Sequence, residues 1–441
     1  MALAAEGRAE AAPRAVRAVL PGGARIVVVR DPTRAVVSVR AVWSGGMRLE
    51  RAATAGLTRL LTDSWTAGCA RRDAAAVDGV LERTEVAMWG IAGRDTIELA
   101  AEWPLSSWRA GLGLLADCAT APRFAAAAVD AARRRMIAER AARERSATER
   151  AWQLLVATLH GTAAYGADPL GSDESLAAID REVIAAHFRD SYPPGAMAIA
   201  VVGDVDADAV VAAARSALSA APQSHARASA PAAAAAAARP PAERQVFGFL
   251  PGDLAAVAVG FPGVAIGDPD RAGLDLLAEV LSARLGAKLR LERRLVHRVS
   301  AMSIEGLEGG FVAVEVACRA DRTAAAAAAL RAEIDRLRTA GPTPGELVRA
   351  VRAVRLRDRA LSPGRRASAL ATDEALGTGA ATARRRDALG RARVADLAGL
   401  AARTLVWDAA VLATVMPPRA SPEAARRARG SVRRPARRRR R

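Results

Sequence analysis

The pattern of hydrophobic and polar positions occurs twice along the chain. In each half a hydrophobic strand leads into a polar, glycine-containing connection, and a helix with an apolar face then begins with Ala-Gly-Leu. Strand, connection and helix start lie at Ala35–Trp43, Ser44–Thr54 and Ala55–Leu61, and again at Leu254–Phe261, Pro262–Arg271 and Ala272–Leu277. The same order with connections of similar length favours two related units over chance similarity in an alanine-rich chain.

Further periodicity predicts the rest of each unit. Apolar runs or alternation predict strands at Ala24–Val29, Arg83–Ala92, Thr96–Glu102, Ala196–Val205, His297–Gly306, Gly310–Cys318 and Ala410–Pro417. Long Ala/Arg-rich stretches between the strands predict helices, among them Trp108–Thr120 and the run from Ala125 to Gly161. Mixed strands with helices grouped between them indicate an α+β class, in which each unit is an antiparallel sheet backed by helices.

Composition places one boundary between the units. Residues 222–243 are rich in alanine and proline and offer no hydrophobic face beyond alanine, as expected of a linker. The predicted divisions are an N-terminal extension (1–17), a first unit (18–221), the linker (222–243), a second unit (244–417) and an Arg-rich tail (418–441).

Composition also indicates the class of protein. The chain has 441 residues, 51% of them hydrophobic, which is ample for two cores. Its three cysteines form no CxxC pair, so no disulfide framework is implied. Neither a signal-peptide pattern nor a run of about 18 apolar residues is present. We therefore expect a soluble, cytoplasmic protein without a membrane span.

The net charge of +18 is concentrated at one end. Residues Arg419–Arg441 hold 11 arginines and one glutamate, and so supply more than half of the excess. This tail has no apolar periodicity and is predicted to be disordered. It is either a solvated extension or a segment that binds nucleic acid or an acidic surface by counterion release. No aromatic residue accompanies it, so the stacking platform of single-strand binders is missing.

Residue chemistry alone identifies no active site. The four histidines, His160, His187, His225 and His297, are far apart, and no HxxH or HxxEH occurs. A G-x-S-x-G nucleophile elbow, a P-loop and a strand-borne GxGxxG are also absent from the sequence.

One helix nevertheless has an unusual polar face. Within "GLTRLLTDSW" (Gly56–Trp65) the leucines lie on one side, while Arg59, Thr62 and Asp63 lie at i, i+3 and i+4 on another. These are spacings at which a helix can place two metal ligands and a general base.

The order of motifs resembles the M16 metallopeptidase family, which includes pitrilysin, insulin-degrading enzyme and the mitochondrial processing peptidase subunits. The segments that carry the resemblance are "LPGGARIVVV", "WSGGMRLERAATAGLTRLLTDSWTAG", "DPLGSDESLAAIDREVIAAHFRDSYPPGAMAIAVVGDV" and "LRLERRLVHRVSA", within residues 18–417. The resemblance implies two homologous M16-type units that face each other like a clamshell.

The resemblance also implies a lost zinc site. Active members bind zinc and activate its water through HxxEH, and this chain has Arg59, Thr62 and Asp63 at those places. Glu139 stands at the position of the remaining ligand; the alternative is an ordinary solvated glutamate. Because arginine offers no lone pair and can pair with a carboxylate at i+4, we predict an ion-paired cluster, no bound zinc and no cofactor.

In the second unit the resemblance implies a substrate-binding pair. Active members place an Arg and a Tyr seven residues apart, and Arg290 and His297 fill these places here. The alternative is an incidental arginine and histidine. A retained binding pair beside a lost metal site indicates the non-catalytic subunit of a heterodimeric zinc peptidase, which binds extended peptide next to a homologue with an intact HxxEH.

Three alternatives remain. One is a stand-alone scaffold or peptide-binding protein, and another is a nucleic-acid-associated protein that acts through the tail. The last is a peptidase with an unorthodox metal site.

Overall fold

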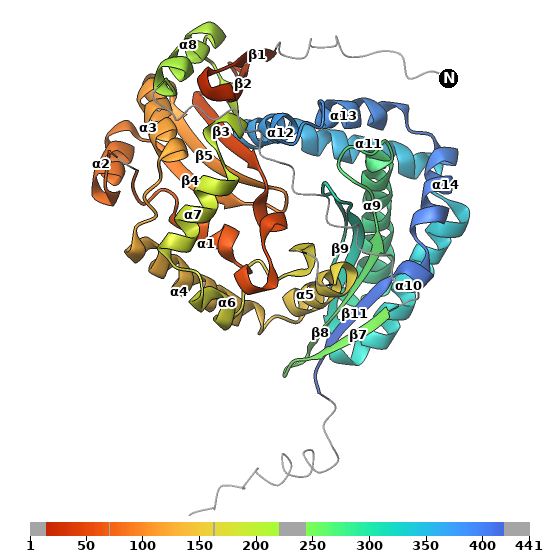
Figure 1. Cartoon of the computed structure of the whole chain (residues 1–441). Coiled ribbons are helices and arrows are strands. Elements are labelled where there is room, and N and C mark those ends of the chain that lie inside the picture. The colour runs from red at the N-terminus through yellow and green to blue at the C-terminus, as the bar shows by residue number, and fades with distance from the viewer. Residues whose placement is uncertain (1–14, 70, 162–163, 220–243, 419–441) are drawn as a thin grey trace, which may run out of the picture.

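The computed structural model describes residues 15–69, 71–161, 164–219 and 244–418. The predicted linker (222–243) and the arginines of the tail lie outside these ranges. Two sheets, each backed by helices, make up the two halves of the molecule (Figure 1), in agreement with the predicted α+β class of two units.

The first sheet has six strands in the order β1-β2-β6-β3-β5-β4. Its strands are β1 (Ala15–Val19), β2 (Arg25–Arg30), β3 (Val36–Ser44), β4 (Ala87–Ala92), β5 (Thr96–Pro104) and β6 (Ala198–Gly203). The helices of this part of the chain are α1 (Leu57–Ser64), α2 (Ala74–Thr84), α3 (Trp108–Thr120), α4 (Ala126–Arg143), α5 (Ala147–His160), α6 (Asp173–Ala177), α7 (Arg181–Ser191) and α8 (Ala207–Ala217).

The second sheet has five strands in the order β7-β11-β8-β10-β9. Its strands are β7 (Arg244–Phe249), β8 (Leu254–Pro262), β9 (Val296–Ile304), β10 (Phe311–Arg319) and β11 (Val411–Met416). The helices are α9 (Arg271–Leu285), which continues into a π-helical segment η7 (Gly286–Glu292), α10 (Thr323–Ala340), α11 (Pro344–Arg359), α12 (Pro363–Leu376), α13 (Ala381–Arg391) and α14 (Val394–Thr404).

The two sheets repeat the same pairing. Strands β2 and β6 run parallel, as do β7 and β11, and the remaining neighbours are antiparallel. The register is also repeated, since Val42 of β3 faces Ala198 of β6 and Gly260 of β8 faces Val411 of β11. The duplication predicted from the recurring pattern is therefore present in the hydrogen-bonded framework.

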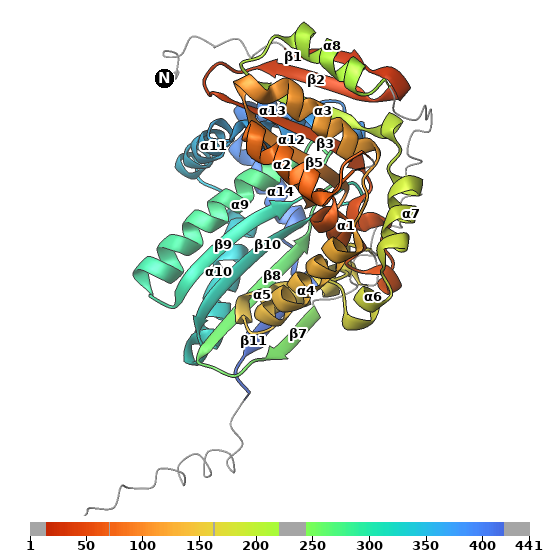
Figure 2. The same cartoon turned by 90° about the vertical axis from the view of Figure 1, so that its left-hand side faces the viewer.

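Each unit covers one face of the other unit's sheet with a helix. Helix α5, from the N-terminal half, packs on β8 and β11, and α12, from the C-terminal half, packs on β3 and β6. Figures 1 and 2 show both helices where the two units meet. Small residues permit the close approach: a Cβ on Gly260 would lie 2.6 Å from a methyl carbon of Leu159. Because each unit packs a helix on the other unit's sheet, apolar contacts as well as the polypeptide chain join the two units.

Burial on both faces explains the strand patterns. The seven residues Val37–Trp43 of β3 are all buried, because the first unit's helices cover one face and α12 the other. Such strands are mostly apolar, and the two polar residues in this one, Ser38 and Arg40, are buried, with Arg40 paired to Glu98. The core on the first unit's helical side includes Trp43 and Trp65, whose rings lie 5.5 Å apart.

Two boundaries differ from the sequence prediction. The expected strand Arg83–Ala92 begins only at Ala87, because α2 continues to Thr84 and ends at Glu85 in the left-handed conformation. The sheet also includes residues placed in the N-terminal extension, since β1 begins at Ala15. Among the described residues, no helix combines the length and hydropathy that crossing a bilayer requires.

Candidate functional site

Helix α1 is the element that holds the predicted polar face. It begins after Gly56, whose φ of 91° is left-handed and therefore suits glycine. The buried carboxylate of Glu50 accepts hydrogen bonds from the backbone N–H groups of Gly56 (3.0 Å) and Thr58 (2.7 Å). These bonds satisfy N–H groups that the helix start leaves without partners. Burial raises the pKa of Glu50, and the hydrogen bonds oppose that shift.

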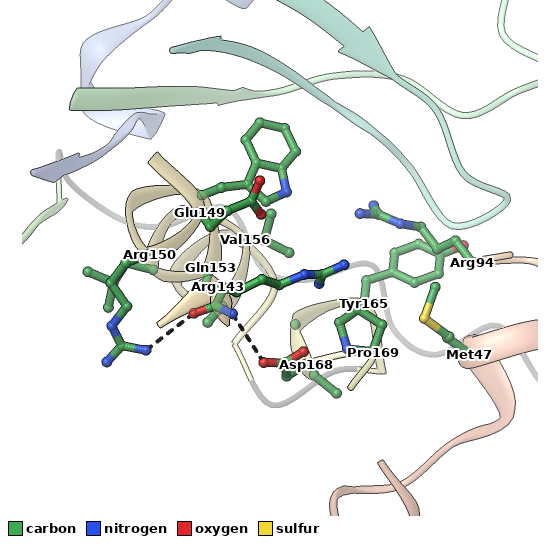
Figure 3. Close-up of a pocket in the computed structure, with 15 residues that line it drawn as sticks. Met47, Arg94, Arg143, Glu149, Arg150, Gln153, Val156, Tyr165, Asp168 and Pro169 are labelled. Atoms are coloured by element: carbon green, nitrogen blue, oxygen red, sulfur yellow. Dashed lines mark hydrogen bonds between the residues drawn. The ribbon is translucent and has the colours of Figure 1, made fainter. Parts of the chain in front are cut away.

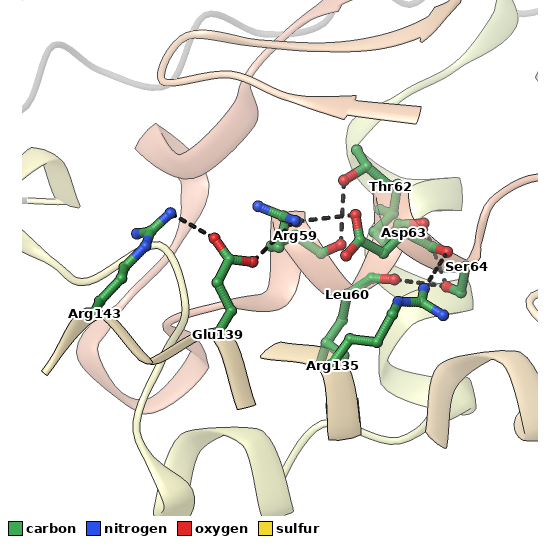
Figure 4. A network of polar contacts seen from close by, with 9 residues as sticks. Arg59, Leu60, Thr62, Asp63, Ser64, Arg135, Glu139 and Arg143 are labelled. Carbon is green, nitrogen blue, oxygen red and sulfur yellow. Dashed lines mark hydrogen bonds and ion pairs between the residues drawn. The ribbon is translucent and has the colours of Figure 1, made fainter. Parts of the chain in front are cut away.

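Four charged side chains form one cluster on the polar face (Figure 4). The guanidinium of Arg59 donates to Asp63 over 2.9 Å and to Glu139 of α4 over 3.3 Å. Glu139 also accepts from Arg143, one turn further along α4, over 2.6 Å. The predicted i, i+4 ion pair is thus present, and Glu139 joins it. We call these four residues the α1 cluster.

Thr62 does not take part in the cluster through its side chain. Its hydroxyl donates to the carbonyl of Arg59 in the preceding turn (3.1 Å), and the residue is only 2% exposed. A neutral hydroxyl is also a far weaker base than a carboxylate, so it does not act as a general base at neutral pH. The position where the resemblance implies a catalytic glutamate therefore holds a structural threonine.

The chemistry of the α1 cluster is that of ion pairing. Zinc sites in enzymes use about three protein donors and an open position for water. Here the two carboxylates, Asp63 and Glu139, already accept from guanidinium groups, and Arg59 has no lone pair to offer. Within the described ranges, no group of three or more His, Cys, Asp or Glu side chains is placed to hold a metal ion.

Strand β4 lies directly against α1. A Cβ on Gly90 would fall 2.2 Å from the carbonyl oxygen of Thr62, so only glycine fits at this contact. Strand β4 is the last strand of its sheet, and its outer edge has no strand partner in the described chain. Trp89 and Ile91 on this edge strand are 37% and 36% exposed. An open strand edge can pair with an extended peptide.

Arg290 and His297, the predicted substrate-binding pair, lie on the second unit and are not bonded to the α1 cluster in the described part of the chain. Arg290 is an exposed residue of η7, and His297 is an exposed residue of β9, the other sheet's edge strand. The register of β9 against β10 shifts at His297, because Arg298 faces Ala317 and Val296 faces Cys318. In the part of the chain that is described, neither side chain forms a hydrogen bond or ion pair with the α1 cluster.

A buried polar group between the units was not predicted from the sequence. Asp95, in the turn between β4 and β5, accepts from the hydroxyl of Tyr165 and from the backbone N–H of Leu307 (3.1 Å). Arg48 lies 3.7 Å from Asp95 and 3.4 Å from Glu308. Burial raises the pKa of Asp95, and the hydrogen bond from Tyr165 opposes that shift. Nothing in the local sequence marks these residues, because they come together only when the units dock.

Comparison with known proteins identifies relatives of large parts of this chain. A family model described as "Peptidase M16 inactive domain" matches residues 178–354. An uncharacterized zinc protease of Streptomyces coelicolor is 26% identical over 347 residues, covering 76% of this chain and 74% of that protein. An uncharacterized zinc protease of Mycobacterium leprae is 29% identical over 216 residues, which is 48% of each chain.

Solved structures show the same fold. A peptidase M16 inactive domain from Pseudomonas fluorescens superposes with a TM-score of 0.81 at 19% identity, covering 92% of this chain and 98% of that one. A protease from Helicobacter pylori gives a TM-score of 0.85 at 17% identity, with 92% and 100% coverage. The periplasmic protease PqqL from Escherichia coli gives 0.71 at 17% identity, and the match covers 93% of this chain and 49% of that larger one.

Proposed function

Because this chain is a homologue of the M16 inactive domain, we propose that it is a non-catalytic M16 subunit. It binds an extended peptide and pairs with a homologue that carries an intact HxxEH zinc site. The observation that carries the proposal is the α1 cluster, in which Arg59 occupies the place of a zinc ligand and holds both nearby carboxylates.

The argument against hydrolysis by this chain is electrostatic. Hydrolysis at zinc needs a water whose pKa the metal lowers, and a base to take its proton. A guanidinium at position 59 places a fixed positive charge where a dication would have to bind, and it supplies no donor atom. Thr62 cannot replace the base, because a hydroxyl oxygen is far less basic than a carboxylate and its proton is donated to the helix backbone. Loss of the zinc site is therefore part of the proposal.

Peptide binding is supported by the open edge of β4. An extended peptide that adds to this edge gains backbone hydrogen bonds, while Trp89 and Ile91 offer apolar contacts for its side chains. Arg290 and His297 are proposed as further substrate contacts from the second unit, because both are exposed polar side chains. A peptide that contacts both the edge of β4 and the edge of β9 would reach residues of both units.

The first experiment measures metal content and peptidase activity of the full chain. We expect the purified protein to contain no stoichiometric zinc and to leave unfolded peptides intact, with Glu139→Ala behaving like the wild type. One equivalent of zinc together with peptidase activity that disappears in Glu139→Ala would overturn the proposal. An intact activity in that variant would indicate a contaminating peptidase, so both proteins are purified in parallel.

The second experiment tests peptide binding at the β4 edge. Fluorescence anisotropy of a labelled, unfolded peptide is expected to show weaker binding for Ile91→Ala than for the wild type. Leu356→Ala is the matched control, since Leu356 is 65% exposed on α11 and does not belong to β4. Equal affinity for all three proteins would refute the assignment to this edge.

The nature of the partner separates the remaining alternatives. Purification from the native organism is expected to recover a homologue with an intact HxxEH. Recovery of the chain without such a homologue favours a stand-alone peptide-binding protein instead. A third possibility is binding of nucleic acid through Arg419–Arg441, which predicts steeply salt-dependent affinity that deletion of these residues abolishes.

A further inference from the structure

A cavity lies beside the α1 cluster and has no role in the function proposed above. It has a volume of about 310 Å³ and is bounded by α5, by the turn that contains Tyr165, and by residues of the first sheet's connections (Figure 3). Its apolar wall includes Met47, Trp152, Val156 and Pro169. The volume falls at the lower end of the range for small-molecule sites. One small ligand, or one to two residues of a peptide, would fill it.

Arg94 is the most informative residue of the wall. Its guanidinium lies 4.8 Å from the ring centre of Tyr165 and 5.3 Å from that of Phe311. Burial lowers the pKa of Arg94. Its Nη1 atom is shielded from solvent and has no hydrogen-bond partner among the described residues. The residue as a whole is half-buried and contacts two rings, but a shielded N–H donor without an acceptor is costly, so an anion close to the guanidinium is favoured.

The carboxylate of Asp95, the next residue in the chain, does not accept a hydrogen bond from Arg94 Nη1. Asp95 follows Arg94 in the chain, but its oxygens accept from Tyr165 and from the backbone of Leu307. Arg48 approaches the same carboxylate to within 3.7 Å. The carboxylate of Asp95 is thus engaged at the contact between the units, and no hydrogen bond among the described residues joins it to Arg94, which lines the cavity.

Arg143 provides a second cation. It lines the cavity and uses one nitrogen to donate to Glu139 over 2.6 Å. A guanidinium has five N–H donors, so the bond to Glu139 leaves others for a ligand. In the view of Figure 3, the guanidinium groups of Arg94 and Arg143 both lie between Tyr165 and α5. They place two cations on a wall whose other charged residues are Glu149, Arg150 and Asp168.

Two carboxylates on the wall limit the charge of the ligand. Asp168 accepts from the backbone N–H of Leu170 (2.9 Å) and from the amide of Gln153 (3.3 Å), so its oxygens are satisfied. Glu149, in the first turn of α5, also lines the cavity. Their negative charges disfavour a dianion such as a phosphate ester more strongly than a monoanion. A single carboxylate matches the arginine pair with the least repulsion.

We propose that this cavity binds a monocarboxylate with an apolar body, whose carboxylate pairs with Arg94 and Arg143 and whose apolar part packs on Trp152 and Val156. The chemistry is shared by a free aromatic or aliphatic acid and by the C-terminal residue of a peptide. The proposal requires neither peptide binding at β4 nor a partner subunit, because all of these residues belong to this chain.

The test is isothermal titration calorimetry of the full chain with 3-phenylpropionate and octanoate. Each acid is compared with its neutral amide, and a short peptide ending in phenylalanine is compared with its C-terminally amidated form. We expect the acids to bind about tenfold or more tightly than the amides, since a charge-assisted bond to a buried guanidinium is lost in the amide. Binding of the small acids identifies a free carboxylate ligand, and binding of the unamidated peptide alone identifies a peptide terminus.

Variants assign the binding to the arginines. Arg94→Met is expected to weaken the acid about tenfold or more. The unliganded protein should melt at a similar temperature, because the variant removes an N–H donor that lacks an acceptor together with the contacts of the guanidinium to Tyr165 and Phe311. Arg319→Met is the control, since Arg319 is 61% exposed and pairs with Asp321 elsewhere. The proposal is overturned if no acid binds, if amides bind as tightly as acids, or if Arg94→Met binds like the control.

Discussion

Replacement of Asp95 tests whether the buried polar group holds the two units together. Its carboxylate accepts from Tyr165 and from the backbone of Leu307, and it lies 3.7 Å from Arg48. The side chains of Arg48, Asp95 and Glu308 are 5%, 10% and 12% exposed. Leu307 and Glu308 belong to the second unit, so the contact crosses between the sheets.

The expected loss follows from what Asp95→Ala leaves behind. Arg48 keeps Glu308, 3.4 Å away, as its ion-pair partner but loses the carboxylate of Asp95. The hydroxyl of Tyr165 and the backbone N–H of Leu307 lose their acceptor. Breaking a buried pair by removing one partner costs about 3–5 kcal/mol. That is a large share of the roughly 5–15 kcal/mol by which domains are usually stable. Asp95→Asn keeps one acceptor oxygen, which can serve either Tyr165 or Leu307 but not both, so its loss should be smaller than that of the alanine variant.

The assay is urea denaturation of the full chain followed by circular dichroism and tryptophan fluorescence. Coincident transitions are expected from both probes, because α5 and α12 tie each sheet to the other unit. The control Asp321→Ala removes an exposed pair with Arg319 and should cost less than about 1 kcal/mol. A loss in Asp95→Ala no larger than in this control would refute the reasoning.

Two further predictions concern packing and pH. Gly90→Ala should destabilise the protein by about 1–3 kcal/mol in the same urea assay, because the added Cβ would lie 2.2 Å from the carbonyl oxygen of Thr62. Gly113→Ala in α3 is the control and should be neutral or stabilising, because a Cβ there meets nothing within 4 Å. Hydrogen bonding to Arg284 lowers the pKa of Glu346 to about 2, below its unfolded value. The stability that Glu346 contributes is therefore fully present above the unfolded pKa of about 4.3 and lost as the pH falls towards the folded value. The gap in unfolding free energy between wild type and Glu346→Gln should shrink between about pH 5 and pH 2, and a gap that stays constant over this range would contradict the assignment.

The local pattern was sufficient for most of the framework. Strand β8 was predicted from a continuous apolar run, which reflects burial on both faces, and β3 from a largely apolar stretch that includes the buried Ser38 and Arg40. The error at Arg83–Ala92 has a local cause, since α2 ends at Glu85 in a left-handed residue that apolar periodicity does not reveal. The roles of Arg290 and His297 stay predictions, because both side chains are exposed and their proposed partner is a peptide.

The sequence by itself determined the α+β class, the duplication and the ion pair between Arg59 and Asp63. Each of these depends on spacings of a few residues, which fix the face of a helix or strand on which a side chain lies. Only the tertiary structure decided that α5 and α12 each pack on the other unit's sheet, that Asp95 joins the units and that Arg94 lines a cavity. These features depend on contacts between segments up to several hundred residues apart, and local periodicity holds no record of such contacts.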